Sequence, residues 1–237
     1  MHYSTVNRFR QRRGRLLRSQ IETLADHLGR DIVVLDVGGR SDYWANVGLA
    51  RIARIDLLNY NPAELDWPFP GDTPVGIFTR RLGDARDLRD FPDASVDLIH
   101  SNSVIEHVGG WSDMSAMASE MMRVGCAGWM QTPAWEFPFE PHFRAPFLHW
   151  FAQPLRARLL SLSIEKRYRQ MPLGRRRGRI EDVNLLSRRE VRELFPGCDI
   201  FTERLILAKS YTVRWMPEGV RLTGRSAAGP EPLPREA

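Results

Sequence analysis

The run IVVLDV at residues 32–37 constrains the fold more than any other part of this sequence. A strand that is apolar almost without interruption is buried on both faces, and such strands are typical of parallel sheets covered by helices. Apolar residues at helical spacing from Leu16 to Leu28 precede it, and the turn-forming pair Gly38 and Gly39 follows it. This order predicts an α/β domain that begins close to residue 30.

Further strands and helices alternate along the rest of the chain. We expect strands at 50–56, 75–82, 96–101 and 127–132, and helices at 112–124 and from the N-cap residue Ser187 onward. The first of these helices carries a methionine stripe, which is expected to pack against the sheet and consists of Met114, Met117, Met121 and Met122. Two more strands, 198–208 and 209–215, close the domain as a hairpin. The pattern predicts a Rossmann-like three-layer sandwich with a mostly parallel seven-stranded sheet and an antiparallel terminal hairpin strand.

Composition shifts suggest three parts of the chain. Residues 1–29 are predicted to be a basic arm, up to about residue 14, and an N-terminal helix. Residues 30–223 form the main domain, with an insertion at 134–180 that is rich in aromatic residues, proline and arginine and lies on the substrate side. The last segment, 224–237, is predicted to be disordered because it is rich in proline, glycine and polar residues.

The chain carries a net charge of +5, concentrated in arginine runs at 7–18 and 174–179. Such runs can bind nucleic acid, anionic lipid or phosphorylated substrates, although a solvated surface is the simpler interpretation. The two cysteines are too few for a disulfide framework or a zinc cluster, and we expect no metal site. No stretch is apolar enough to cross a membrane or resembles a signal peptide, so a cytoplasmic protein is expected.

Glycine and polar residues gather where five predicted strands end. In open α/β sheets, ligands bind at the carboxyl ends of the strands. The first end lacks the spacing G-x-G-x-x-G of a dinucleotide site, because Arg40 and Ser41 follow the two glycines, and no phosphate-binding G-x-x-x-x-G-K occurs. The remaining candidate cofactor is S-adenosylmethionine, whose methionine end carries no phosphate.

Five segments carry a specific resemblance: VVLDVGG at 33–39, ARIDLLNYNP at 53–62, GDARDL at 83–88, FPDASVDLIHSNSVIEHV at 91–108, and the fifth strand with its QTP. With them the chain resembles the class I S-adenosylmethionine-dependent methyltransferases, and within that superfamily it is similar to the type 11 small-molecule methyltransferases. The resemblance spans roughly residues 30–215.

The resemblance implies a set of cofactor-binding residues. Asp36, Gly38 and Gly39 match the motif whose backbone cradles the methionine portion, with Arg40 and Asp42 in place of two later glycines. Asp56 matches the acidic residue that accepts from the ribose hydroxyls, and Asn59 takes its place if that strand runs longer. Asp84 and Ala85 match the positions that contact the adenine. Ser101 and Asn102 match the start of the loop that borders both cofactor and acceptor.

Three residues are candidates for the catalytic machinery. Glu140 and His142 flank Pro141 just after the fifth strand, where the family's acceptor pocket lies, and extended backbone would put both side chains on one face. A glutamate beside a histidine can orient the ring and raise its basicity, which suits a general base for an oxygen nucleophile. The third candidate is His107, although a structural role is favoured there, and a structural hydrogen bond is the alternative for Glu140 and His142.

The sequence leaves the acceptor open. The preferred function is methylation of a small molecule, a saccharide or a lipid-linked acceptor, with oxygen favoured as the acceptor atom. A basic amphipathic segment in 134–180 would also suit peripheral contact with the inner face of an anionic membrane, whereas its aromatic residues could instead cap the cleft or form a dimer face. The alternatives are an RNA methyltransferase, disfavoured because SNSV replaces the usual N-P-P-Y type tetrapeptide, and an inactive regulatory protein with this fold. The oligomeric state is not determined.

Overall fold

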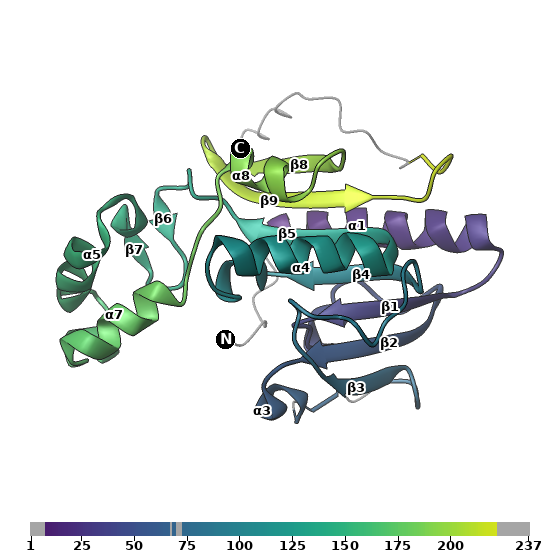
Figure 1. Cartoon of the computed structure of the whole chain (residues 1–237), viewed down its shortest axis with the longest axis horizontal. Helices are drawn as coiled ribbons and strands as arrows, with labels where there is room; N and C mark the ends of the chain where they lie inside the picture. The colour runs from purple at the N-terminus through teal and green to yellow at the C-terminus, as the bar shows by residue number, and fades with distance from the viewer. Residues whose placement is uncertain (1–7, 67, 70–72, 222–237) are drawn as a thin grey trace, which may run out of the picture.

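A seven-stranded sheet runs through the centre of the computed structural model (Figure 1). The structure describes residues 8–66, 68–69 and 73–221. Its strands are β1 (Ile32–Val37), β2 (Ile52–Asn59), β3 (Phe78–Leu82), β4 (Val96–Asn102), β5 (Gly125–Pro133), β8 (Asp199–Arg204) and β9 (Ala208–Trp215). In the order β3-β2-β1-β4-β5-β9-β8, the first five are parallel, and β9 and β8 pair antiparallel. The predicted Rossmann-like sheet with its antiparallel terminal hairpin is confirmed.

Helices cover both faces of the sheet, which makes three layers (Figure 1). On one face α1 (Arg8–Leu28) buries an apolar stripe, and on the other α4 (Trp111–Val124) and α8 (Arg188–Leu194) do the same. Successive residues of β1 alternate between the two cores, Val34 packing with α1 and Leu35 with α4. The predicted methionine stripe lies in the second core, with Met114, Met117 and Met121 at most 3% exposed.

The first helix begins at Arg8, well before the apolar spacing that starts at Leu16, so residues 8–14 are helical and not an arm. Contacts with the β8–β9 edge explain the difference. Arg13 forms an ion pair with Glu203, and the Lys209 ammonium lies 3.8 Å from the centre of the Phe9 ring. Tertiary contacts therefore stabilise turns that carry no apolar pattern of their own. Residues 1–7 of the predicted arm and the predicted disordered tail, 224–237, lie outside the described residues.

Several strand boundaries differ from the prediction, and two of them show the cause. The strand expected to end at Asp56 continues to Asn59, because its last residues pair with the end of β1 on one side and with β3 on the other. The third strand was expected from Val75 but begins at Phe78. Both differences arise from pairing partners that a local pattern does not reveal.

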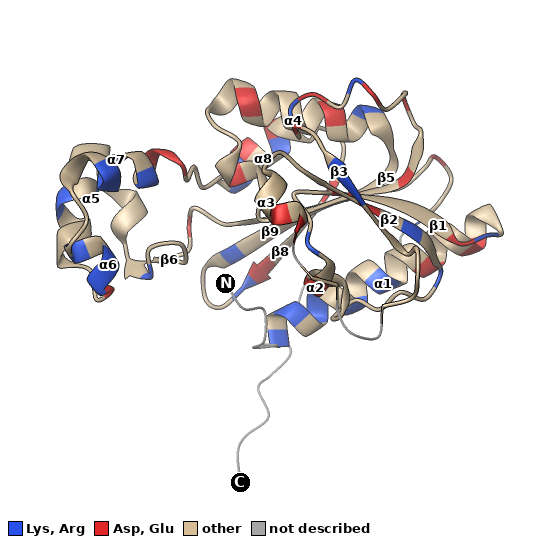
Figure 2. Cartoon of the chain, turned by 90° about the horizontal axis from the view of Figure 1, so that it is seen from below, with Lys and Arg blue, Asp and Glu red and all other residues tan. Residues whose placement is uncertain are grey.

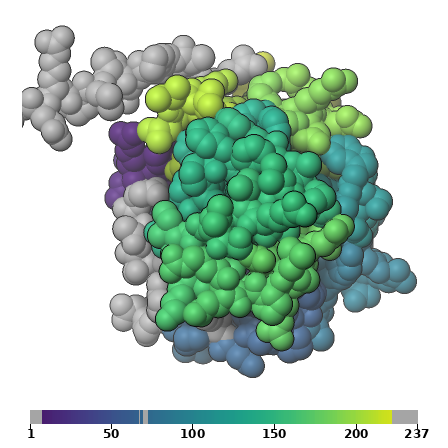
Figure 3. Space-filling view, turned by 90° about the vertical axis from the view of Figure 1, so that its left-hand side faces the viewer, coloured from purple at the N-terminus to yellow at the C-terminus, as the bar shows by residue number. Residues whose placement is uncertain are grey.

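Residues 134–180 form a lobe at the carboxyl ends of the parallel strands (Figure 1). The lobe contains β6 (Phe139–Glu140), β7 (Ala145–Pro146), α5 (Gln153–Leu159), α6 (Lys166–Arg169) and most of α7 (Leu173–Glu181). It has an apolar cluster of its own, which includes Phe143, Leu160 and Tyr168. In the space-filling view these residues cover the end of the sheet that faces the viewer (Figure 3). The lobe thus stands where ligands bind in open α/β sheets.

Candidate active site

The glycine turn after β1 brings the backbone close to its neighbours. Gly38 has φ of 71°, a left-handed conformation that favours glycine, and its N–H donates to Leu58 O at 2.7 Å. A Cβ built on Gly39 would lie 1.9 Å from the Asp36 carboxyl, so no side chain fits there. The two glycines therefore allow a tight turn that packs directly against the Asp36 carboxyl.

Asp36 lies beneath this turn and points inward. Its carboxylate is 1% exposed, accepts a hydrogen bond from Trp44 Nε1 at 2.7 Å, and lies 2.6 Å from His100 Nδ1. Trp44 belongs to α2 (Ser41–Trp44) and His100 to β4, so the carboxylate ties three elements together. Asp36 supports the loop from below.

Arg40 and Asp42 pair with one another where the family motif has glycines. The Arg40 guanidinium lies 3.4 Å from Asp42 Oδ1 and 3.9 Å from Glu64 Oε2, and both side chains of the first pair are mostly buried. Arg40 O also accepts from Tyr43 N as α2 begins. The substituted positions thus close the loop with an ion pair.

Asn59, and not Asp56, stands at the carboxyl end of β2. Asp56 is 3% exposed within the strand and forms ion pairs with Arg54 at 2.9 Å and Arg81 at 3.1 Å. Asn59 donates from Nδ2 to Gly39 O at 2.8 Å, which fixes its amide against the glycine turn. The placement of Asp56 at a strand end is therefore wrong, and the substitute residue occupies that place.

Asp84 and Ala85 follow β3 at the same edge. Gly83 N donates to Asn59 O at 3.0 Å, which joins this segment to the end of β2. The Asp84 carboxylate pairs with Arg86 at 2.6 Å, and hydrogen bonds from that guanidinium hold the pKa of Asp84 below its usual value. Ala85 is nearly buried in the core beside Leu88. Asp84 is consequently a half-exposed anion at the carboxyl edge of the sheet, just after β3.

The end of β4 presents buried polar atoms toward the same region. Ser101 Oγ and Asn102 Oδ1 are buried and have no hydrogen-bond partner among the described residues. The next residue, Ser103, adopts φ of 56°, and its N–H donates to Gln131 O at 2.8 Å. Buried polar atoms without partners are costly in a protein interior, so a ligand that bonds to them gains from their preorganisation.

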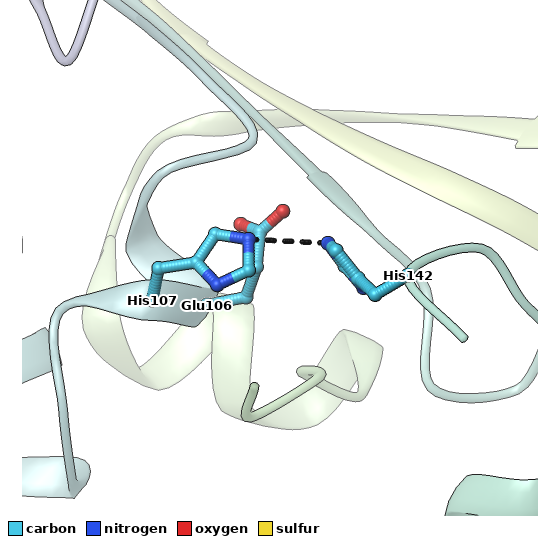
Figure 4. Close-up of side chains that lie close together, drawn as sticks. All are labelled: Glu106, His107 and His142. Carbon is cyan, nitrogen blue, oxygen red and sulfur yellow. Dashed lines mark hydrogen bonds between the residues drawn. The ribbon is translucent and has the colours of Figure 1, made fainter. Parts of the chain in front are cut away.

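Two histidines from distant segments meet beside this edge (Figure 4). His107 ends the short helix η1 (Ile105–His107) after β4, and His142 follows β6 in the lobe. Their Nε2 atoms lie 3.1 Å apart. His142 Nδ1 donates to Glu140 Oε1 at 2.6 Å, and His107 Nδ1 donates to Asp182 O at 2.9 Å. The predicted contact of Glu140 with His142 is present.

Two carboxylates set the electrostatics of this pair. Burial lowers the pKa of His142, but the hydrogen bond and the charge of Glu140 outweigh it and leave the pKa above its usual value. Glu106 is fully buried behind the rings, and burial raises its pKa against the opposing effect of His107. Its Oε2 accepts from Thr132 Oγ1 at 3.0 Å. The pair therefore lies between two buried acids.

A cavity of about 250 Å³ opens next to the histidine pair, between the lobe and the helices α4 and α8. Aromatic and aliphatic side chains form much of its wall, with Glu140, Arg156 and Glu190 as charged groups. None of the predicted cofactor residues lines it. Glu140 lines the cavity and also accepts a hydrogen bond from His142, so the cavity lies next to the histidine pair.

Sequence comparison defines the class of protein. Residues 35–128 match a family model described as a methyltransferase domain, the part of the chain that contains β1 to the start of β5 and the glycine turn. Residues 35–128 therefore form a methyltransferase domain, and the protein is an S-adenosylmethionine-dependent methyltransferase. No curated protein matches the chain by sequence.

Solved structures show the same fold at low identity. A co-crystal structure of WbdD with a kinase inhibitor is 17% identical with a TM-score of 0.53, covering 85% of this chain and 40% of WbdD. Another WbdD structure, described as a bifunctional kinase-methyltransferase, is 16% identical with a TM-score of 0.50 over 85% and 39%. A possible exported protein from Bordetella parapertussis is 14% identical with a TM-score of 0.51 over 85% and 68%. The chain spans about 40% of the length of WbdD.

The described residues fit the cofactor of this class. The glycine turn lies at the end of β1, Asn59 is hydrogen-bonded to it, and the unpartnered atoms of Ser101 and Asn102 lie at the end of the neighbouring strand β4. The donors and acceptors suit a ligand with hydroxyl, amino and carboxylate groups. These residues would hold the cofactor, which supplies an activated methyl group when bound.

Sequence reasoning missed the meeting of His107 with His142 and the part played by Glu106. The two histidines are 35 positions apart, and the Asp182 carbonyl that orients His107 is a further 40 along the chain. Local spacing carries no signal for such contacts. Only the adjacency of Glu106 to His107 and of Glu140 to His142 hinted at the cluster.

Proposed function

We propose that this methyltransferase transfers the methyl group to a hydroxyl oxygen of a small molecule, a saccharide or a lipid-linked acceptor. The observation that supports it best is the histidine pair, His107 and His142, which stands at the carboxyl edge a few residues after the unpartnered atoms of Ser101 and Asn102. An alcohol needs help to lose its proton, whereas the methyl donor is already activated.

In this proposal the chain holds an acceptor hydroxyl at the histidine pair, in line with the methyl group, and excludes water. Glu140 accepts from His142 Nδ1, so the neutral ring has its lone pair at Nε2. From there His142 draws the proton of the hydroxyl, and Glu140 stabilises the charge that develops on the ring.

The adjoining cavity is the proposed acceptor pocket. Its wall combines flat apolar surfaces, Trp111 and Trp135 among them, with the guanidinium of Arg156. Ligand pockets of this kind bind the apolar body of a molecule on their walls and fix its orientation through a few polar groups. Arg156 donates from Nε to Phe151 O at 2.6 Å, which holds the guanidinium in place.

Calorimetry with S-adenosylhomocysteine tests the cofactor half of the proposal. We expect one site per chain, and absence of binding would favour a regulatory protein that kept the fold without the reaction. Salt-sensitive RNA binding together with methylated RNA would favour the RNA methyltransferase instead.

A labelled-methyl assay with saccharides, nucleotide sugars and lipid-linked saccharides tests the acceptor half. His142→Gln should lower the rate about a hundredfold, the usual size of a general-base contribution, and leave the affinity for S-adenosylhomocysteine unchanged. His27→Gln, at an exposed position on α1, is the matched control and should keep the full rate. A full rate in His142→Gln would refute the role of the pair.

The lobe also suits a surface of anionic lipid, and we propose peripheral contact there. Leu162 and Ile164 are 78% and 85% exposed. The same lobe exposes lysine and arginine side chains at positions 158, 166, 167, 169, 175, 177 and 179, and Figure 2 shows this basic character over α5, α6 and α7. Exposed apolar side chains among basic ones are typical of proteins that bind membrane surfaces.

A further inference from the structure

While both rings are neutral, the contact between the Nε2 atoms of His107 and His142 lacks a proton donor. Glu140 and the Asp182 carbonyl only accept hydrogen bonds, so the Nδ1 atom of each ring must carry its proton. In neutral rings both Nε2 atoms then present lone pairs, yet they lie 3.1 Å apart. Two lone pairs repel one another at that distance unless a cation lies between or beside them.

A third donor atom points to the same place. Glu106 is 0% exposed, and its Oε1 has no hydrogen-bond partner among the described residues. One carboxylate oxygen of Glu106 and one nitrogen from each histidine lie within 4.8 Å of one another. Figure 4 shows the carboxylate behind the two rings, on the side where they approach. A buried carboxylate oxygen without a hydrogen-bond partner is unfavourable unless it lies beside a cation or binds a metal.

We infer that Glu106, His107 and His142 bind a divalent first-row transition metal ion. Two imidazoles and one carboxylate form a known ligand set for such ions, with coordination positions left for other ligands. Metal–nitrogen bonds of about 2.0–2.1 Å at a tetrahedral angle place two nitrogens about 3.3 Å apart, close to the separation observed.

The atoms behind the ligands support the site. Glu140 and the Asp182 carbonyl each accept from the Nδ1–H of one histidine, and Thr132 donates to Glu106. Metal-binding histidines almost always donate their other N–H to a carboxylate or a carbonyl, which fixes the tautomer and the ring orientation. Each of the three ligand side chains therefore has a hydrogen bond to a neighbouring group that fixes its orientation, as metal ligands usually have.

The role of the ion rests on the proposed function, whereas its binding does not. In methyl transfer, an ion at this place would coordinate the acceptor oxygen and favour its deprotonated form. With the ion bound, deprotonation of the acceptor at the ion would replace the proton transfer to His142 proposed above, because the imidazole lone pairs would then bind the ion.

Metal titration of the full chain, freed of any affinity tag and treated with a chelator, tests the inference. Zn²⁺ followed by calorimetry, and Co²⁺ followed by its visible absorption, should each show one site per chain. Zn²⁺ should also raise the melting temperature, because an ion that binds only the folded state stabilises it.

Variants locate the site. His107→Ala and His142→Ala should abolish Co²⁺ absorption, Glu106→Gln should weaken Zn²⁺ binding, and Glu140→Gln should weaken it by about tenfold or more. His27→Ala, an exposed histidine on α1, is the matched control and should bind as the unmutated chain does. Binding of S-adenosylhomocysteine by each variant reports whether the domain is folded.

Three results would overturn the inference: no ion bound by the unmutated chain, full binding by His107→Ala and His142→Ala, or a proton shared between the two rings in place of the ion. These results are independent of the test of the proposed function. That test measures S-adenosylhomocysteine binding, which the chelated protein can show whether or not it has a metal site. A chelated protein that methylates its acceptor at the full rate would remove the ion from the reaction while leaving the site intact.

Discussion

At the scale of single residues, the buried aspartates Asp36 and Asp56 lie on neighbouring strands but bind different partners. Asp36 accepts from Trp44 and contacts His100 beneath the glycine turn, whereas Asp56 pairs with two arginines inside β2. Leu35 is the register partner of Asp56, so the two carboxylates occupy neighbouring strands at different depths from the edge. Their depth in the sheet, and not their charge, decides what each can reach.

Replacement of Asp36 by alanine should lower the free energy of unfolding by about 2–5 kcal/mol, because two buried donors lose their acceptor. Urea denaturation followed by circular dichroism measures the change. Asp90→Ala, at an exposed position outside this loop, serves as the control and should change stability little. An Asp36→Ala variant as stable as the unmutated chain would show that this carboxylate does not hold the turn.

Asn59→Ala should weaken S-adenosylhomocysteine binding by about tenfold, the loss of one or two hydrogen bonds. Asp56→Ala should leave that affinity unchanged, because its carboxylate is engaged inside the strand. Calorimetry of both variants decides between the two residues. A weaker cofactor affinity for Asp56→Ala alone would restore the assignment made from the motif.

At the scale of elements, α8 is a helix that its own sequence specifies. Ser187 Oγ accepts from Glu190 N, and the Glu190 carboxylate accepts from Ser187 N at 2.7 Å, which completes a capping box. The predicted N-cap at Ser187 is confirmed. Val191 and Leu194 of this helix pack into the core under β9, so the cap stabilises an element that also supports the sheet.

Ser187→Ala should destabilise the protein by about 1 kcal/mol, the usual loss of an N-cap hydrogen bond. The measurement is the urea midpoint at constant slope. Ser115→Ala, at an exposed position inside α4, is the control and should change stability little. Equal effects of the two substitutions would mean that the cap contributes nothing.

At the scale of the whole molecule, a lobe with its own apolar cluster stands over the carboxyl edge of the sheet. Arginine-rich helices and exposed apolar side chains give this lobe a surface unlike that of the sheet domain (Figure 2). Among the residues that the structure describes, every helix is too short or too polar to cross a bilayer.

The full chain should co-sediment with vesicles of anionic lipid at low salt and dissociate at high salt, because salt screens charge attraction. Ile164→Asp should lower the partition coefficient onto the vesicles by about tenfold or more, because burial of an isoleucine side chain contributes a free energy of that size. Val75→Asp, equally exposed but before β3 at the amino edge, is the control. Absence of vesicle binding at low salt would reject this contact.

The sequence by itself determined the layer architecture, the parallel sheet with its terminal hairpin, and the class of enzyme. Buried strands, helical spacing and capping residues act locally, so IVVLDV, the methionine stripe and Ser187 could be interpreted in place. Strand ends were less certain, since β2 reaches Asn59 only through its pairing with β1 and β3. The helical turns of residues 8–14 likewise depend on contacts with β8 and β9.

Only the tertiary structure decided the candidate site. Glu140 and His142 are near in sequence, and their contact could be predicted from spacing. His107 meets His142 because the lobe folds back over the end of β4 and because Asp182 orients the other ring. Contacts across such distances form when the whole chain packs, and no local pattern encodes them. For the same reason, a pair of histidines that the sequence shows as separate residues becomes, in the folded protein, a candidate metal site.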